Sequence, residues 1–179
     1  MSTAIVVFVL RELFELMRRR AATGRQIEAY KIILRRECEL NAWAVTRLRE
    51  TLEAMKSNPG HFKVFKTEFD LRFEFESEGG RNSWPIPSVY LDDIKGSMLA
   101  VAALQSDIFE RLERCYEACL DLVNLRQHTV EYLFGQADGY DVEALHDYGS
   151  RELKDIHTAL DRLYRACTNG EELGAGIPY

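Results

Sequence analysis

The chain has 179 residues, of which 46% are hydrophobic and 29% charged, the balance of a globular protein with a buried core. This length indicates one domain, or one domain with short extensions, rather than a multidomain chain. The formal net charge of −6 argues against general binding of nucleic acid through a basic surface.

Charge is distributed unevenly along the chain. Residues 1–36 carry eight Lys or Arg against three acids, a net +5 that leaves −11 on the remainder. A basic segment on an acidic body predicts a negatively charged neighbour, which is membrane lipid, nucleic acid or the acidic part of another copy. The alternative is that these cations pair with the protein's own acidic helices.

Residues 2–21 are predicted to form a helix that is apolar on every side between Ala4 and Leu10. This run is too short to span a membrane, which takes about 20 predominantly apolar residues. Three interpretations stay open: the first turns are buried in a bundle, the helix lies in a membrane interface, or residues 5–9 form a buried strand. The residues expected to meet a membrane or a neighbouring subunit are Val6, Phe8, Val9, Arg18, Arg19 and Arg20.

Gly24 is expected to end this helix, because glycine suits the left-handed conformation found just after helices. A second helix is predicted from about residue 25 to 57, with an apolar seam close to a heptad rhythm. The seam consists of Ile27, Tyr30, Leu34, Cys38, Val45, Leu48, Leu52 and Met55. Asn41 falls on the same seam, and a polar residue there costs stability and fixes register or partner choice.

The connector over residues 62–76 is ambiguous between strand and helix. Apolar residues from Phe69 to Phe75 alternate with charged ones, which is the strand period. The phenylalanines also recur with helical spacing, at Phe62, Phe65, Phe69 and Phe73. A strand here would have an open edge that could pair with another chain. The segment after it, 77–87, is predicted to be a loop.

The clearest helical pattern begins near residue 88. Ser88 is a plausible N-cap, and Asp92 and Asp93 follow in the first turns, where the helix dipole favours acids. Apolar residues then repeat at spacings of three and four as far as Phe134, in a stripe wide enough for several neighbours. An unbroken helix would measure on the order of 70 Å. We therefore expect an elongated bundle, a kink that divides the helix, or other copies covering its far end.

The C-terminal region is predicted to contain a short helix at about 142–147 and a last helix at about 151–167. Gly149 and Ser150 are expected to separate them, with Ser150 as the N-cap of the last helix. Residues 168–179 are expected to form a flexible tail, which leaves 1–167 as a single domain. The predicted fold class is all-α: an elongated bundle of four to five helices, with two long antiparallel helices and the Phe-rich connector.

The chain has four cysteines, all in helical apolar patterns: Cys38, Cys115, Cys119 and Cys167. This is typical of reduced thiols in a cytosolic protein. Cys115 and Cys119 share a helix face and offer metal ligands together with Cys38 or a histidine, but buried core thiols are the favoured interpretation. Glu143 and His146 form one Glu-x-x-His element, and a di-iron site needs two. We predict neither a metal nor a cofactor.

Arg151 and His157 stand five intervening residues apart on the last predicted helix. About one Arg–x(4–6)–His match is expected by chance in a chain of this composition, so the spacing alone is uninformative. On an ideal helix the two side chains point about 120° apart. A catalytic pair would therefore need a cleft formed by two copies.

This motif and the helical layout resemble the HEPN superfamily of small all-α proteins, in which an Arg–x(4–6)–His motif sits on a late helix. The layout also looks like the small CRISPR-associated HEPN-like accessory proteins that accompany RNA-targeting effectors. Similarity to the ribonuclease members implies metal-independent RNA cleavage, with His157 as general acid/base and Arg151 stabilising the phosphorane charge. Similarity to the accessory members implies a helical, oligomeric, membrane-associated protein.

Three functions stay open from the sequence. The first is a non-catalytic, self-associating helical protein whose basic N-terminus meets a membrane or a neighbouring subunit, as an accessory factor in bacterial antiviral defence. The second is a HEPN-type ribonuclease that acts on RNA through Arg151 and His157. The third is a small helical adaptor or inhibitor that binds one host protein. The expected location is the cytoplasm, or the inner face of the cell membrane.

Overall fold

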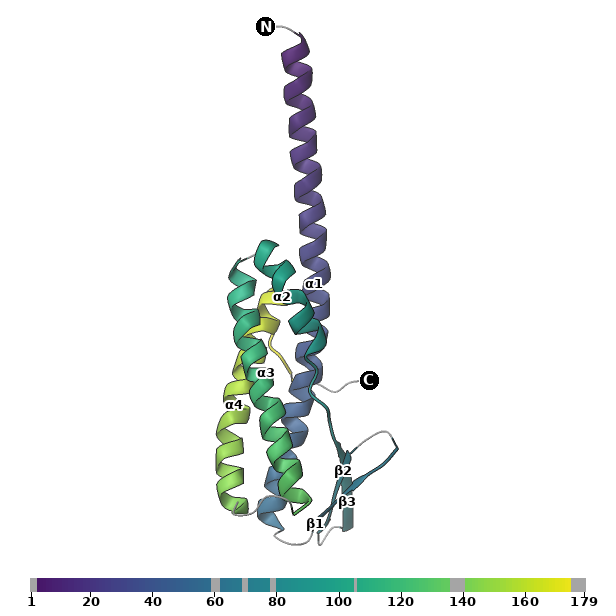
Figure 1. Ribbon diagram of the computed structural model, residues 1–179, viewed down its shortest axis with the longest axis vertical. Coiled ribbons are helices and arrows are strands. Elements are labelled where there is room, and N and C mark those ends of the chain that lie inside the picture. The colour runs from purple at the N-terminus through teal and green to yellow at the C-terminus, as the bar shows by residue number, and fades with distance from the viewer. Residues whose placement is uncertain are drawn as a thin grey trace.

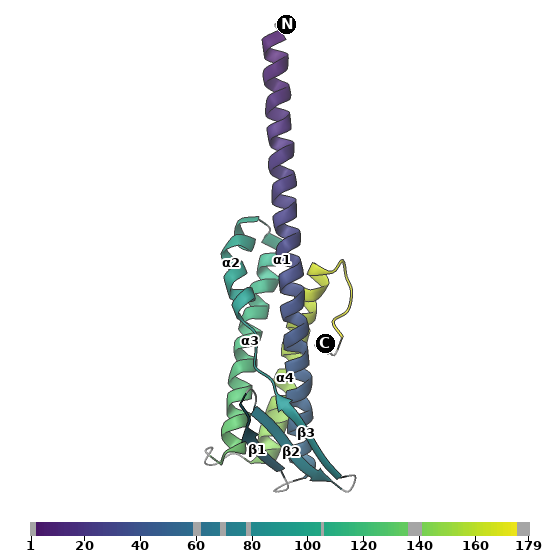
Figure 2. The same cartoon turned by 90° about the vertical axis from the view of Figure 1, so that its right-hand side faces the viewer.

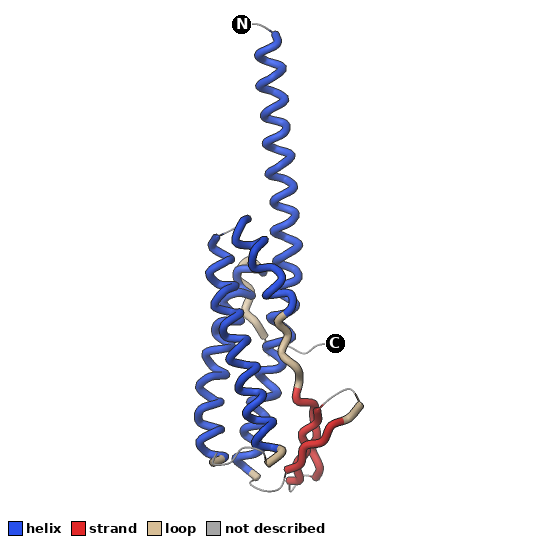
Figure 3. The backbone as a smooth tube through the Cα atoms, in the orientation of Figure 1, coloured by secondary structure: helices blue, strands red, loops and turns tan. Residues whose placement is uncertain are grey.

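The computed structural model describes residues 3–58, 62–68, 71–77, 80–104, 106–135 and 141–174, leaving aside the side chains of 3–7, 9, 77, 106 and 107. The described residues form four helices and a three-stranded sheet (Figures 1 and 3). The elements are α1 (Thr3–Ser57), β1 (Phe62–Lys66), β2 (Leu71–Ser77), β3 (Gly80–Ile86), α2 (Asp92–Leu104), α3 (Ser106–Leu133) and α4 (Val142–Cys167). The fold is mainly helical, and the expectation of an all-α protein is wrong for the connector, which contains the sheet.

α1 is a single helix of 55 residues whose C-terminal half packs in the bundle and whose N-terminal half projects beyond it (Figures 1 and 2). The predicted helix end at Gly24 is wrong, and so is the alternative of a strand at 5–9. A helix already formed in the bundle extends residue by residue without a new nucleation cost. The Glu15–Arg19 ion pair, 3.7 Å long and one turn apart, supports the extension.

The predicted apolar seams are confirmed where the helices meet. On α1 the buried seam residues are Leu34, Cys38, Val45, Leu48, Leu52 and Met55. The other helices contribute Ile94, Val101, Ile108, Leu112, Leu122, Leu153, Ile156, Leu160 and Leu163 to the same core. Burial of these side chains is the main favourable term for the bundle, at about 25 cal/mol per Å² of apolar surface removed from water.

The long helix predicted over 88–134 is divided in two. α2 ends at Leu104, and α3 starts at Ser106 and runs in the opposite direction (Figure 2). Of the three alternatives, division of the helix is the one that the structure contains, since it lets both halves of the apolar stripe pack within one chain. α1 runs antiparallel to α2 and α4 and parallel to α3. A long antiparallel pair is thus present, but α1 forms it with α4 and not with an unbroken helix over 88–134.

α4 is continuous from Val142 to Cys167, so the predicted break at Gly149 and Ser150 is wrong. The helix begins on Asp141, whose carboxylate accepts a hydrogen bond from the backbone N–H of Glu143 at 3.3 Å. Gly149 is buried where α4 crosses α1 and α3. A Cβ at this position would lie 2.5 Å from Leu52 Cδ1, so the glycine serves close helix packing instead of a turn.

The connector forms an antiparallel meander in the order β1-β2-β3, so its strand interpretation is confirmed. The predicted loop is wrong over 80–86, which is β3. Phe73 pairs across the sheet with Trp84 and is fully buried, with the ring centroids 5.4 Å apart. Trp84 Nε1 donates a hydrogen bond to Thr51 Oγ1 at 3.0 Å, which joins the sheet to α1. Pro85 is tolerated because β3 lies at an edge of the sheet.

Two buried polar residues of α1 bind the backbone of the segment that connects the sheet to α2. The Asn41 amide donates to the carbonyl of Tyr90 at 2.7 Å and accepts from the N–H of Tyr90 at 2.8 Å. The Glu37 carboxylate accepts bonds from the backbone N–H groups of Asp93, at 3.3 Å, and Ile94. α2 therefore begins on a carboxylate from α1, not on the predicted N-cap Ser88.

A flexible tail was predicted for residues 168–179. The part of it that the structure describes folds back along α4 as far as Leu173. The Leu173 side chain is buried, and its N–H donates to Asp161 Oδ1 at 2.9 Å. Glu172 pairs with Arg165 at 2.9 Å. Residues 175–179 lie outside the described part.

Candidate functional surfaces

The first candidate surface is the part of α1 that precedes its contact with α2 and α3, residues 3–26, which we call the projecting segment. It carries six large apolar side chains on ten consecutive residues, each between 50% and 70% exposed: Phe8, Leu10, Leu13, Phe14, Leu16 and Met17. The prediction that the first turns are buried in the bundle is therefore wrong for these positions. Exposed apolar clusters on this scale mark contact with another molecule.

Four of these side chains form a stripe. Leu10, Leu13, Phe14 and Met17 have the spacing i, i+3, i+4, i+7, which places them on one face of the helix. The other faces carry charges of both signs, including Arg11, Glu12, Glu15, Arg18 and Arg19. The projecting segment is thus amphipathic along part of its length.

The predicted interface arginines Arg18, Arg19 and Arg20 are all exposed. Because they are consecutive, their side chains point in three directions about 100° apart around the helix axis. Along the axis they lie between the apolar stripe and the bundle. The side chains of Val6 and Val9 lie outside the described part. Among the residues that the structure describes, none belongs to a helix long and apolar enough to cross a membrane.

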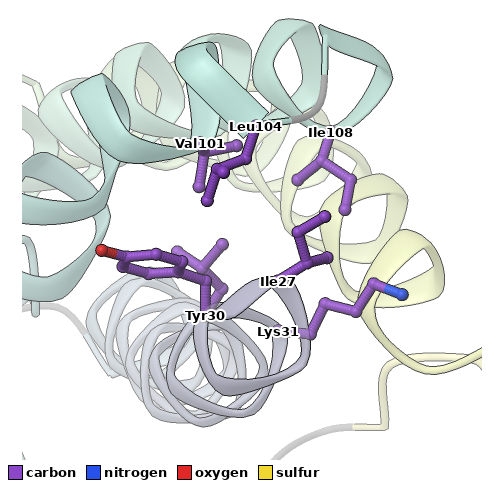
Figure 4. A pocket seen from close by; sticks show the side chains of 7 residues that line it. Ile27, Tyr30, Lys31, Val101, Leu104 and Ile108 are labelled. Atoms are coloured by element: carbon purple, nitrogen blue, oxygen red, sulfur yellow. The ribbon is translucent and has the colours of Figure 1, made fainter. Parts of the chain in front are cut away.

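An apolar seam closes the base of the projecting segment. Ile27 and Tyr30 of α1 face Val101 and Leu104 of α2 and Ile108 of α3 across it (Figure 4). Lys31 and Leu34 of α1 complete the lining. The space left between them is about 10 Å³. That is at the lower limit of what a single water needs, so the seam is a packing contact and not a ligand pocket.

Arg151 and His157 both lie on α4, as predicted, but no contact joins them within one chain. Arg151 is exposed, and its Nε donates to the carbonyl of Asp147 at 3.4 Å. His157 is half-buried, on the flank of α4 that also carries Tyr164, whose hydroxyl donates to Glu39 of α1 at 3.3 Å. The two candidate catalytic groups therefore face different sides of the helix.

Three of the cysteines meet in the core. Cys38 of α1 is hydrogen-bonded to Cys115 of α3, and Cys115 is also hydrogen-bonded to Cys119. All three are free thiols. The bond to Cys115 and burial raise the pKa of Cys119 well above its usual value, so the thiol stays protonated and unreactive at neutral pH. Among the described residues no group of three or more Cys, His, Asp or Glu is placed to hold a metal ion.

His146, singled out in the Glu-x-x-His element, joins α4 to α1. Its Nε2 lies 3.1 Å from Glu53 Oε1, and its Nδ1 lies 2.9 Å from Asp147 Oδ1. Lys56 Nζ is also 3.2 Å from Asp147. Burial lowers the pKa of His146, but the hydrogen bonds to Asp147 and Glu53 outweigh it and leave the pKa raised. The sequence held no signal for this contact, because Glu53 lies far away along the chain.

Comparison of the chain with protein-family models, curated proteins and solved structures finds no match. What the protein does is therefore to be inferred from its own surfaces. The projecting segment concentrates exposed apolar side chains more densely than any other described helix or strand.

Proposed function

We propose that this protein is a non-catalytic helical subunit that self-associates through the projecting segment. The observation that carries the proposal is the exposed stripe of Leu10, Leu13, Phe14 and Met17 on a helix that leaves the bundle. A stripe with this spacing is what a second amphipathic helix covers. Covering it with another copy would remove from water the apolar surface that the chain itself leaves exposed.

The charges of the projecting segment suit a second copy as the neighbour of the stripe. Glu12 and Glu15 lie beside five arginines, so two copies that cover each other's stripes can pair charges of opposite sign along the contact. The excess of arginine also suits an anionic lipid surface, and flotation with vesicles distinguishes the two neighbours.

The resemblance to HEPN-like accessory proteins supports the same role and extends it. It suggests an accessory factor in bacterial antiviral defence, with a membrane surface as a second neighbour of the assembly. The consecutive arginines Arg18, Arg19 and Arg20 would then meet anionic headgroups, at about 1 kcal/mol for each cation near the surface.

Measurement of the native mass tests self-association. Over a concentration series in analytical ultracentrifugation, the wild-type chain should sediment as a multiple of its 20.7 kDa mass. The double variant Leu13→Glu, Phe14→Glu should sediment as a monomer with an unchanged bundle. Leu99→Glu is the matched control, because Leu99 is 87% exposed on α2 but lies outside the stripe. This control should keep the wild-type mass.

A wild-type monomer at all concentrations, with and without detergent, would remove the basis of the proposal. Flotation with anionic vesicles distinguishes between a second copy and lipid as the molecule that covers the stripe. A wild-type chain that stays monomeric in water but floats with vesicles, while the double variant does not, would assign the stripe to lipid and contradict self-association.

A second candidate is a metal-independent ribonuclease that uses Arg151 and His157. The observation in its favour is that the Arg151 guanidinium is exposed and, among the described residues, makes a single long hydrogen bond, to a carbonyl, which leaves it able to bind a phosphate. Because the two side chains face different sides of α4, this activity would require a cleft between copies.

An RNA cleavage assay in the presence of EDTA tests the ribonuclease. If His157 is a general acid/base, His157→Ala should lower the rate at least about 100-fold. His128→Ala, which changes an exposed histidine of α3, should leave it unchanged. Absence of cleavage by the wild type, or equal rates for the wild type and His157→Ala, would rule this candidate out.

A further inference from the structure

A hollow between α3 and α4 gathers three arginines. It is lined by Glu110, Arg111 and Arg114 of α3 and by Ala159 and Arg162 of α4, and its volume is about 180 Å³. α3 and α4 lie side by side and run antiparallel (Figure 1), and both helices contribute arginines to the lining of the hollow. The hollow is unrelated to the projecting segment and to the Arg151–His157 pair.

These arginines differ from most others on the bundle, which have partners. Carboxylates pair with Arg35, Arg36, Arg47, Arg81 and Arg165. Hydroxyl or carbonyl oxygens accept from Arg72, Arg126 and Arg151. Within the part of the chain whose side chains are described, Arg111, Arg114 and Arg162 have neither a hydrogen bond nor an ion pair. Glu110, one turn before Arg114, does not come within ion-pair distance of it.

The three arginines are exposed, and Glu110 is the one acidic residue among the five that line the hollow, so the lining is basic overall. An anion bound there would reduce the repulsion between the guanidinium groups. A phosphate suits the position, because its oxygens accept paired bonds from the planar guanidinium fork. The hollow, with a volume of about 180 Å³, has room for such a group, whereas the seam at the base of the projecting segment, with about 10 Å³, does not.

The surroundings favour a small ligand over a nucleic-acid strand. Asp121 of α3 and Asp155 of α4 are exposed and lie two turns further along the same helices. Basic charge therefore does not continue along the groove, as the phosphates of a strand would require. We propose that this hollow is a binding site for a small phosphate-bearing molecule, held by Arg111, Arg114 and Arg162.

Isothermal titration calorimetry with inorganic pyrophosphate, at constant ionic strength, tests the site on the full chain. The wild type should bind saturably, with one ligand per chain. Arg114→Gln and Arg162→Gln should each weaken binding about tenfold or more, because each removes charged hydrogen bonds. Arg49→Gln is the control, since Arg49 is an exposed bundle arginine without a partner in the described part but lies outside the hollow. It should bind as the wild type does.

Thermal melts confirm that each variant is folded, so a loss of binding is not a loss of structure. Absence of saturable heat with the wild type, or equal weakening by Arg49→Gln, would overturn the proposal. Citrate that binds as tightly as pyrophosphate would show recognition of charge alone and overturn the assignment to phosphate. An RNA oligonucleotide that binds more tightly than pyrophosphate, and depends on the same arginines, would overturn the assignment to a small ligand.

Discussion

At the scale of single residues, Glu37 and Asn41 show how α1 organises the rest of the chain. One turn apart and buried, they bind the backbone of residues 90–94 and so determine where α2 begins. Burial raises the pKa of Glu37 to about 6, although the N–H groups of Ile94 and Asp93 favour the charged form and oppose the shift. A carboxylate is held here partly because the first turn of a helix attracts negative charge.

The raised pKa of Glu37 predicts a pH-dependent stability. A carboxyl group with a higher pKa in the folded than in the unfolded chain binds its proton more tightly when folded. Its contribution is therefore fully present below its ordinary pKa of 4.5 and is lost as the pH rises through about 6, by at most about 2 kcal/mol. Glu37→Gln should remove this decline, because the amide oxygen still accepts one of the two backbone hydrogen bonds and the side chain does not titrate.

Urea unfolding of the two proteins between pH 4.5 and 7 measures the effect. The free energy of unfolding of the wild type should fall relative to that of Glu37→Gln across this range. Glu28→Gln, which changes an exposed carboxylate of the same helix, should follow the wild type. Parallel curves for the wild type and Glu37→Gln would show that the buried carboxyl group does not titrate differently in the folded chain.

At the scale of elements, periodicity located the helices and the strand but not their ends. The seams of α1, α3 and α4 and the alternation in β2 are visible in the sequence because each reflects a single repeating geometry. Gly24 and Gly149 were both expected to end helices, and both lie inside one. At Gly24 the helix simply continues from its buried half, and at Gly149 the absence of a side chain lets three helices approach closely. Sequence pattern does not separate these uses of glycine from a cap.

Alanine at the two glycines should therefore have opposite effects. Gly149→Ala brings a Cβ against the buried Leu52 side chain, and overpacking of this kind costs about 1–3 kcal/mol. Alanine has a higher helix propensity than glycine, which offsets about 1 kcal/mol of this cost, so we expect a net loss of up to about 2 kcal/mol and a lower Tm. Gly24→Ala meets nothing within 4 Å and should leave Tm unchanged or raise it.

Thermal unfolding followed by circular dichroism measures both variants. Gly24→Ala serves as the control for the general effect of replacing a helical glycine. A Gly149→Ala protein as stable as the wild type would mean that Leu52 and Leu125 rearrange without loss, contrary to a close-packed crossing of the three helices.

At the scale of the whole molecule, the sequence anticipated the unusual N-terminal region but not its geometry. The charge asymmetry and the apolar run predicted a contact surface over residues 1–21, which stays a prediction. On the part of α1 beyond the bundle, residues 8, 10–14 and 16–20 are exposed. The sequence was sufficient to place Arg151 and His157 on the same helix and on different faces of it, because the angle between two side chains of a helix depends only on their spacing. The hollow of Arg111, Arg114 and Arg162 could not be foreseen, since it depends on α3 turning back from α2 to face α4.

The continuity of α1 has a mechanical consequence. At 1.5 Å per residue it is a rod about 80 Å long, exposed at one end and anchored at the other to the sheet through Thr51 and to α4 through Glu53 and Lys56. A partner that binds the N-terminal part of α1 can tilt the whole helix, because a stiff helix moves as one body. Such a tilt also moves the sheet that is attached to the C-terminal end of α1. Whatever holds the first turns thus also determines how the three strands are presented to their surroundings.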